Sequence, residues 1–99
     1  MNSLSSVDNA GIVSTIAKID VGNATAVEFT ITTGKHGATI QNTGSNLCWV
    51  GGSDVNPTNL DGAKLFPSQS ITFQNVQSNF SIFFLCESGA TTTLGGYEF

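Results

Sequence analysis

The chain has 99 residues, enough for one domain that hides roughly two-thirds of the surface its unfolded chain would expose. Charged residues make up only 10% of the chain, and its formal net charge is −4. The chain therefore lacks the basic surface that binding to phosphate backbones or anionic lipids requires. No apolar run approaches the ~18 residues of a membrane span, and the opening residues lack the blocks of a secretory signal. We therefore expect no nucleic-acid or membrane partner, and we expect the chain to stay in the compartment where it is made.

The first ten residues differ in composition from the rest of the chain. They are rich in Ser and Asn, with Leu4 and Val7 as apolar exceptions. A segment of this kind buries too little apolar surface to join a compact core. We interpret residues 1–10 as a flexible arm and residues 11–99 as a single domain.

From residue 11 onwards polar and apolar residues alternate with period two, and Val, Ile and Thr are abundant. In the clearest case Val27, Phe29 and Ile31 point one way while the polar residues between them point the other way. No stretch shows the apolar spacing of a helix. The pattern predicts strands over residues 12–19, 25–33, 38–42, 46–50, 63–66, 70–75, 79–86 and 91–99.

Seven to eight short strands without a helix predict an all-β fold, either a small antiparallel β-sandwich or a small barrel. The pattern leaves jelly-roll-like and immunoglobulin-like strand orders open. Residues 79–86 are apolar on both sides, which predicts a central, covered strand. The sequence Asn42-Thr-Gly-Ser-Asn46 predicts a tight hairpin between its two flanking strands, and Gly95-Gly96 predicts a bulge or bend in the last strand.

Residues 51–62 form the longest predicted loop, with Gly, Ser, Asp, Asn or Pro at almost every position. Val55 and Leu60 are its apolar anchors. Because loops on a rigid scaffold often carry recognition, we take Asp54 and Val55 as candidate partner-binding residues. Asp54 and Asp61 could together coordinate calcium, but the loop lacks the dense acidic spacing of calcium-binding loops, so we expect no metal there.

The side chains needed for catalysis do not form a recognisable set. His36 is the only histidine and lies in a glycine-bracketed turn without metal-ligating neighbours. The Gly-x-Ser-x-Gly motif is absent, and the seven acidic residues are dispersed along the chain. We therefore expect no enzymatic activity, no catalytic residues, no metal and no cofactor.

Cys48, Trp49 and Cys86 lie in apolar segments. Buried, reduced cysteines behave as small hydrophobic residues, and this is our interpretation of both, although a disulfide between neighbouring strands stays open. An exposed Trp49 would offer a platform for stacking a sugar. Burial of Trp49 in the core or in a subunit interface is the interpretation we favour.

Five short elements between Ala38 and Phe73 resemble a pattern found in small β-sandwich structural proteins of tailed bacteriophages. These elements are Asn42-Thr-Gly44, Val50-Gly-Gly-Ser-Asp-Val55, Gly62, Leu65-Phe-Pro67 and Ser70-Ile-Thr-Phe73. The stretch that contains them covers about a third of the chain, and each element is ordinary turn chemistry. In the turn after Leu65 this chain has Ser68 where the pattern more often has Gly.

The resemblance implies a capsid decoration or cement protein, without enzymatic activity or cofactor, that binds the major capsid protein or another virion protein. It also implies a homotrimer and a location in the virion, with assembly in the host cytoplasm. In such a protein the arm would reach over a neighbouring subunit, with Leu4, Val7 and Ile12 as its contacts. The alternative is a carbohydrate- or receptor-binding module of a tail fibre or head appendage, using Trp49, Tyr97 and the loop 51–62.

Overall fold

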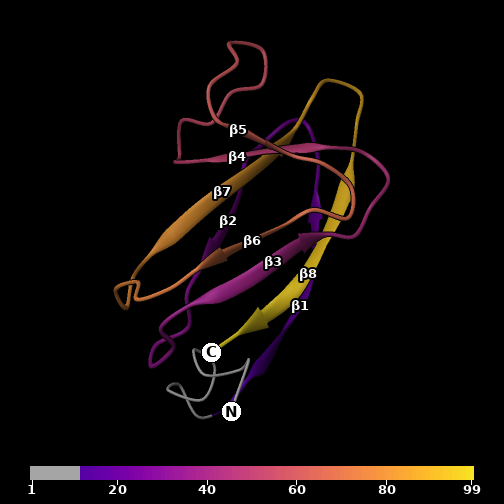
Figure 1. The fold of residues 1–99 in the computed structure, drawn as a ribbon. Helices are drawn as coiled ribbons and strands as arrows, with labels where there is room; N and C mark the ends of the chain where they lie inside the picture. Colours follow the sequence, from indigo (N-terminus) through magenta and orange to yellow (C-terminus); the bar gives the residue numbers. More distant parts are fainter. Residues whose placement is uncertain (1–11) are drawn as a thin grey trace.

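A computed structural model describes residues 12–99 and shows eight antiparallel strands in two packed sheets, a β-sandwich (Figure 1). Each predicted strand segment overlaps one of the observed strands, so the all-β prediction is confirmed. No helix long and apolar enough to cross a membrane occurs among these residues. The strands are β1 (Ser14–Val21), β2 (Val27–Thr30), β3 (Ala38–Asn42), β4 (Cys48–Gly51), β5 (Ala63–Leu65), β6 (Ser70–Phe73), β7 (Ser81–Cys86) and β8 (Thr92–Glu98).

The strand order is that of a jelly roll, which settles the alternative that the sequence left open. One sheet has the order β1-β8-β3-β6 and the other β2-β7-β4-β5. The antiparallel pairs β1·β8, β2·β7, β3·β6 and β4·β5 make the chain one long hairpin that is rolled up, with residues 51–62 at its tip. The roll is closed by the pairs β3·β8 and β4·β7. Only β4 and β5 are consecutive strands in the same sheet.

The predicted hairpin between residues 38–42 and 46–50 is wrong, because β3 and β4 lie in different sheets. Their connection passes from one sheet to the other close to the start of β8, where the Thr43 backbone nitrogen donates to the Thr93 carbonyl at 2.9 Å. Gly44 takes no left-handed conformation there. It is required for space, since a Cβ at Gly44 would collide with the side chain of Thr92 and lie 2.8 Å from the backbone nitrogen of Thr93.

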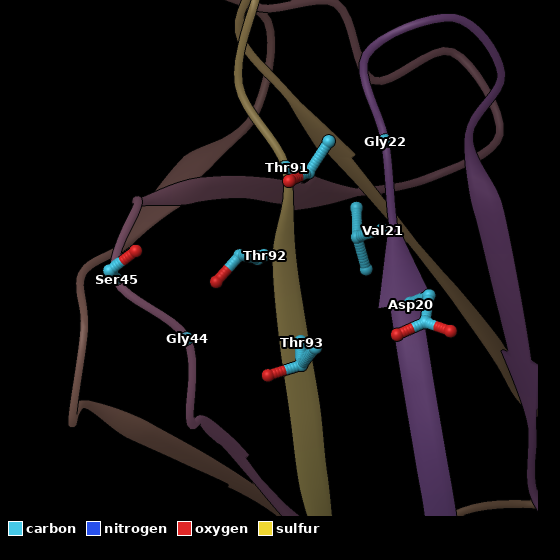
Figure 2. Close-up of a pocket in the computed structure, with 8 residues that line it drawn as sticks. All are labelled: Asp20, Val21, Gly22, Gly44, Ser45, Thr91, Thr92 and Thr93. Carbon is cyan, nitrogen blue, oxygen red and sulfur yellow. The ribbon is translucent and has the colours of Figure 1, made fainter.

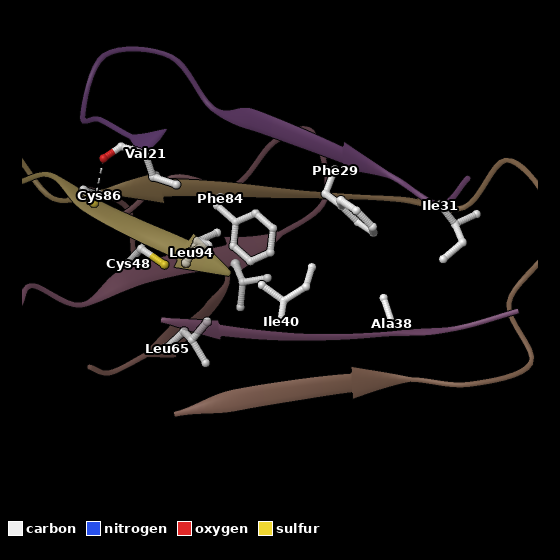
Figure 3. Packing of buried hydrophobic residues seen from close by; sticks show 11 residues of the cluster. Val21, Phe29, Ile31, Ala38, Ile40, Cys48, Leu65, Phe84, Cys86 and Leu94 are labelled. Carbon is white, nitrogen blue, oxygen red and sulfur yellow. Dashed lines mark hydrogen bonds between the residues drawn. The ribbon is translucent and has the colours of Figure 1, made fainter. Parts of the chain in front are cut away.

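The prediction that residues 79–86 form a central strand is confirmed, since β7 lies between β2 and β4. The inner faces of the two sheets alternate as the sequence pattern requires and meet in one apolar core (Figure 3). Phe84 lies at its centre and is fully buried, which contributes about 2 kcal/mol. The buried cluster consists of Val21, Phe29, Ile31, Ala38, Ile40, Cys48, Val50, Leu65, Phe84, Cys86 and Leu94.

The bulge predicted at Gly95-Gly96 belongs to the neighbouring strand. Strand β8 runs through both glycines, while the register of β1 shifts between Ile16 and Ile19. Lys18 lies within this shift, on the exposed edge strand of its sheet. A bulge and a charged side chain on an edge strand both discourage pairing with a further strand.

A fully buried amide, that of Asn42 at the end of β3, joins the two sheets. Its Nδ2 donates to the carbonyls of Asn46 and Leu65, both at 2.9 Å. Its Oδ1 accepts from the Thr92 hydroxyl at 2.7 Å and from the Gly44 backbone nitrogen at 3.1 Å. All four hydrogen bonds that a buried Asn side chain can make are therefore formed.

We expect Asn42→Ala to lower the free energy of unfolding by about 3 kcal/mol or more, because it leaves buried groups of Leu65 and Thr92 without their partner. Asn46→Ala is the matched control, since the exposed Asn46 side chain donates one bond to the Thr91 carbonyl. It should cost less than about 1 kcal/mol. Urea denaturation measures both values, and equal losses would contradict the role assigned to Asn42.

Candidate functional site

The residues predicted to bind a partner do not form one cluster. Leu4 and Val7, with the arm predicted over residues 1–10, lie outside the described residues. Ile12 is 76% exposed, and its carbonyl accepts a hydrogen bond of 2.6 Å from the Lys35 ammonium group. Asp54 is exposed on the loop 51–62, which lies at the other end of the sandwich from the start of β1 and the end of β8 (Figure 1).

The loop between β4 and β5 is held by its own hydrogen bonds. The backbone groups of Asn56 and Asp61 exchange two bonds of 2.9 Å, which close the tip as a narrow bridge. The Asn56 side chain accepts bonds from the backbone nitrogens of Thr58 at 3.0 Å and Asn59 at 3.3 Å. Such an Asx turn fixes the backbone without help from the core.

The two apolar residues of this loop have opposite roles. Val55 is buried, and its side chain packs beside Gly51 and Gly62, so it anchors the loop to the sheet. Leu60 is 71% exposed, so the prediction that it is a second anchor is wrong. The backbone of Leu60 has φ = 62°, a left-handed conformation that costs a residue other than Gly about 1–2 kcal/mol. This conformation holds an apolar side chain in solvent at the tip.

Trp49 does not offer an exposed ring. It lies on the outer side of its sheet but is only 4% exposed, and its indole Nε1 donates to the Glu87 carboxylate at 3.0 Å. The Lys64 ammonium group lies 5.7 Å from the centre of the ring. Tyr97 is on the other sheet. A sugar platform that combines Trp49 and Tyr97 is therefore incompatible with the fold, whereas burial of Trp49, the interpretation favoured from the sequence, is confirmed.

A cleft with a mixed polar and apolar lining opens where the ends of β1 and β3 meet the start of β8 (Figure 2). Its volume is about 420 Å³. It offers the Asp20 carboxylate and the Ser45 and Thr91 hydroxyls, a set that suits a ligand rich in hydroxyl groups. Sequence reasoning missed this cleft, because its walls come from three distant segments. The lining residues are Asp20, Val21, Gly22, Gly44, Ser45, Thr91, Thr92 and Thr93.

Metal-ligating side chains are not gathered in the part of the chain that the structure describes, where no group of three or more His, Cys, Asp or Glu could hold an ion. His36 is exposed, and its backbone nitrogen donates to the Phe99 oxygen at 2.7 Å. Asp54 and Asp61, considered above for calcium, are both exposed loop residues.

Both cysteines are buried with free thiols, as their apolar surroundings predicted. They are direct partners across β4 and β7. Burial, and secondarily the neighbouring Cys86, raises the pKa of Cys48 to about 12. Burial also raises the pKa of Cys86, while a backbone hydrogen bond with Thr92 acts in the opposite direction. Since the thiolate is the reactive form, both groups are inert near neutral pH.

Comparison with protein-family models, with curated proteins and with solved structures finds no match to this chain. The part of the phage resemblance that the structure supports is the small two-sheet sandwich itself. Any functional assignment must therefore come from the surfaces described above, because one fold serves many functions.

We expect a thiol reagent at pH 8 to label neither cysteine in the folded protein and both in denaturant. At that pH only about one Cys48 in ten thousand is ionised, and the core excludes the reagent. Counting the labelled thiols by intact mass tests this expectation. Labelling of the folded protein as fast as of the unfolded chain would contradict it.

The same pKa shift predicts a loss of stability in alkali. Burial raises the pKa of Cys48 in the folded state from 9.0, the value for an exposed thiol, to about 12, so the folded state keeps its full stability below pH 9 and loses it as pH rises towards 12. We expect the free energy of unfolding to fall over this range, with a shallower fall in Cys48→Ala. Urea titrations at several pH values measure both slopes, and identical slopes would refute the assignment to Cys48.

Proposed function

We propose that this chain is a non-enzymatic structural protein of a phage virion, a capsid decoration or cement subunit that binds and stabilises the capsid surface. The observation that carries the proposal is Leu60, an apolar side chain held in solvent by a strained backbone at the tip of a self-supported loop. Non-glycine residues in left-handed conformations concentrate at functional sites. An exposed apolar side chain on a rigid support is also the form that anchors of protein interfaces take.

The chemistry around Leu60 indicates the kind of partner surface it fits. Asp54 and Asp61 are exposed on the same loop, and no basic residue occurs between Gly51 and Gly62. The complementary surface is therefore an apolar pocket with a basic rim. We assign that pocket to the major capsid protein or to another virion protein.

The overall shape supports a bridging role. The sandwich measures 43 × 25 × 20 Å, and the loop 51–62 lies at the opposite end from the first described residues, which begin at Ile12 (Figure 1). If residues 1–10 act as an arm, one molecule contacts two capsid subunits through its two ends. We propose Leu4, Val7 and Ile12 as the contacts of the arm end.

One row of uncharged side chains on an outer sheet face suits packing against copies of the same chain. Thr15, Tyr97, Thr39 and Thr72 lie in one row across β1, β8, β3 and β6, and none of them is charged. Uncharged polar surface costs less to desolvate on assembly than charged surface does. We propose a homotrimer on the capsid, as the resemblance implies.

The alternative is a carbohydrate- or receptor-binding module of a tail fibre or head appendage. The cleft beside Asp20 and Ser45 favours it, because a saccharide is recognised by a few carboxylate and hydroxyl groups set among apolar contacts. Jelly rolls occur in both viral capsid proteins and lectins, so the fold is compatible with either function.

The copy number of the chain in purified particles separates the two proposals. In virions assembled from the genome that encodes it, we expect roughly one chain per capsid protein, or one trimer per local threefold axis, measured on a stained gel of disassembled particles. A handful of copies would favour the appendage. Complete absence from purified particles would refute both proposals.

We expect deletion of residues 2–10 to abolish binding to particles that lack the protein, while the circular dichroism of the sandwich stays unchanged. The reason is that the deletion removes Leu4 and Val7 but none of the described strands. Sedimentation of the variant with such particles measures binding. Full binding by the truncated chain would refute the role assigned to the arm.

Leu60→Asn separates binding from stability. Asn tolerates the left-handed conformation, so we expect the free energy of unfolding to rise by about 0.5–1 kcal/mol while particle binding falls at least tenfold. Leu60→Met is the matched control, since it keeps the apolar volume and should retain binding. Undiminished binding by Leu60→Asn would remove Leu60 from the interface.

A further inference from the structure

We propose that Cys48 and Cys86 are a built site for an intramolecular disulfide, which a peroxide can close within the folded domain and which would join β4 to β7. The two residues face each other in register at the ends of these strands, and both are fully buried in the core. This inference does not depend on the proposed function.

The hydrogen bonds of β7 show which kind of pair the two cysteines form. In antiparallel sheets, facing residues alternate between hydrogen-bonded pairs and non-hydrogen-bonded pairs, and the side chains are closer in the latter. The backbone nitrogen of Cys86 donates to the Gly22 carbonyl at 2.9 Å, away from β4. Cys48 and Cys86 are therefore a non-hydrogen-bonded pair.

The other end of β7 gives the same register independently. The backbone nitrogen of Ile31 donates to the Phe80 carbonyl at 2.9 Å. Counting along β7 in steps of two, Phe84 directs its backbone groups to β2, so its pair with Val50 on β4 is non-hydrogen-bonded. Two residues further on, the pair of Cys48 and Cys86 has the same character.

This register brings the two Cα atoms to about 4.5 Å, within the 4.4–6.8 Å range of disulfides. Both side chains point to the same face, because Cys48 and Cys86 belong to the same buried cluster. Their thiols are also close enough for an ionised Cys86 to raise the pKa of Cys48. The disulfide therefore requires no change of strand register.

Cys86 contacts two of the residues that line the cleft of Figure 2. Its thiol donates to the Val21 carbonyl at 3.5 Å, as the dashed line in Figure 3 shows, and Val21 lines the cleft. Thr92, which forms a backbone hydrogen bond with Cys86, lines the same cleft. Cys86 is thus one residue away from the cleft, and we take it as the thiol that hydrogen peroxide oxidises first.

The oxidation balances with one molecule of hydrogen peroxide. The Cys86 thiolate attacks one peroxide oxygen, the O–O bond breaks, and a sulfenic acid and hydroxide form. The Cys48 sulfur then attacks the Cys86 sulfur and displaces the hydroxyl group as water. In total, two thiols lose two electrons and two protons to the peroxide, which is reduced to two molecules of water.

The test uses the full chain at about pH 9, where the thiolate fraction is larger than at neutral pH. After treatment of the folded protein with hydrogen peroxide and removal of the oxidant, the protein is denatured, alkylated and weighed. We expect no alkylation and a mass lower by two hydrogen atoms, with both thiols restored by a reductant. The oxidised protein should remain a monomer on a non-reducing gel and melt at least about 5 °C higher than the reduced protein.

Cys48→Ala and Cys86→Ala are the controls, and neither should show the mass loss or the rise in melting temperature. The wild-type comparison alone keeps the test decisive if a variant fails to fold. Any of three results would overturn the proposal: two thiols that still alkylate after treatment, sulfinic acid in place of the disulfide, or an oxidised protein that melts lower than the reduced one.

Discussion

The fold depends on the buried amide of Asn42, because it fixes the point where the chain leaves one sheet for the other. Its Nδ2 donates to the carbonyls of Asn46 and Leu65, and its Oδ1 accepts from the Thr92 hydroxyl. The connection from β3 to β4, the start of β8 and the end of β5 are thus joined at one side chain. An apolar residue of similar size would leave buried polar groups of all these segments unpaired, which costs about 1–3 kcal/mol each. The Asn42 amide therefore specifies where the chain passes from one sheet to the other.

The sequence alone predicted where the strands lie but not how they pair. Alternation of Val27, Phe29 and Ile31 is a local property, and so is the two-sided apolarity of β7. The order of strands depends on contacts between distant residues. The hairpin prediction failed because Asn42 and Gly44 are both good turn residues, yet here Asn42 serves a buried network and Gly44 makes room for Thr92. The same residue types fit both local structures, and only tertiary contacts decide between them.

The candidate site was predictable to a similar extent. Composition identified residues 51–62 as the prominent loop, but it could not distinguish Val55 from Leu60, since both are apolar residues in a polar segment. Burial of one and exposure of the other follow from the bridge between Asn56 and Asp61 and from the left-handed backbone at Leu60. The cleft beside Asp20 was not predictable, because it exists only where three distant segments meet.

Two features of the fold are unusual, one at the tip of the rolled hairpin and one in the core. At the tip, Leu60 holds a strained backbone and an apolar side chain in water, which a substitution to Asn would relieve. In the core, Cys48 and Cys86 face each other without a bond, although their register fits one. A domain of this size has only about 5–15 kcal/mol of net stability, so the backbone strain at Leu60 is a sizeable fraction of it. The left-handed backbone at Leu60 belongs to the tight turn inside the Asn56–Asp61 bridge, where the Leu60 nitrogen donates to the Pro57 carbonyl at 3.1 Å. The turn therefore accounts for the backbone conformation, and the exposed apolar side chain is the feature that no contact within the sandwich explains.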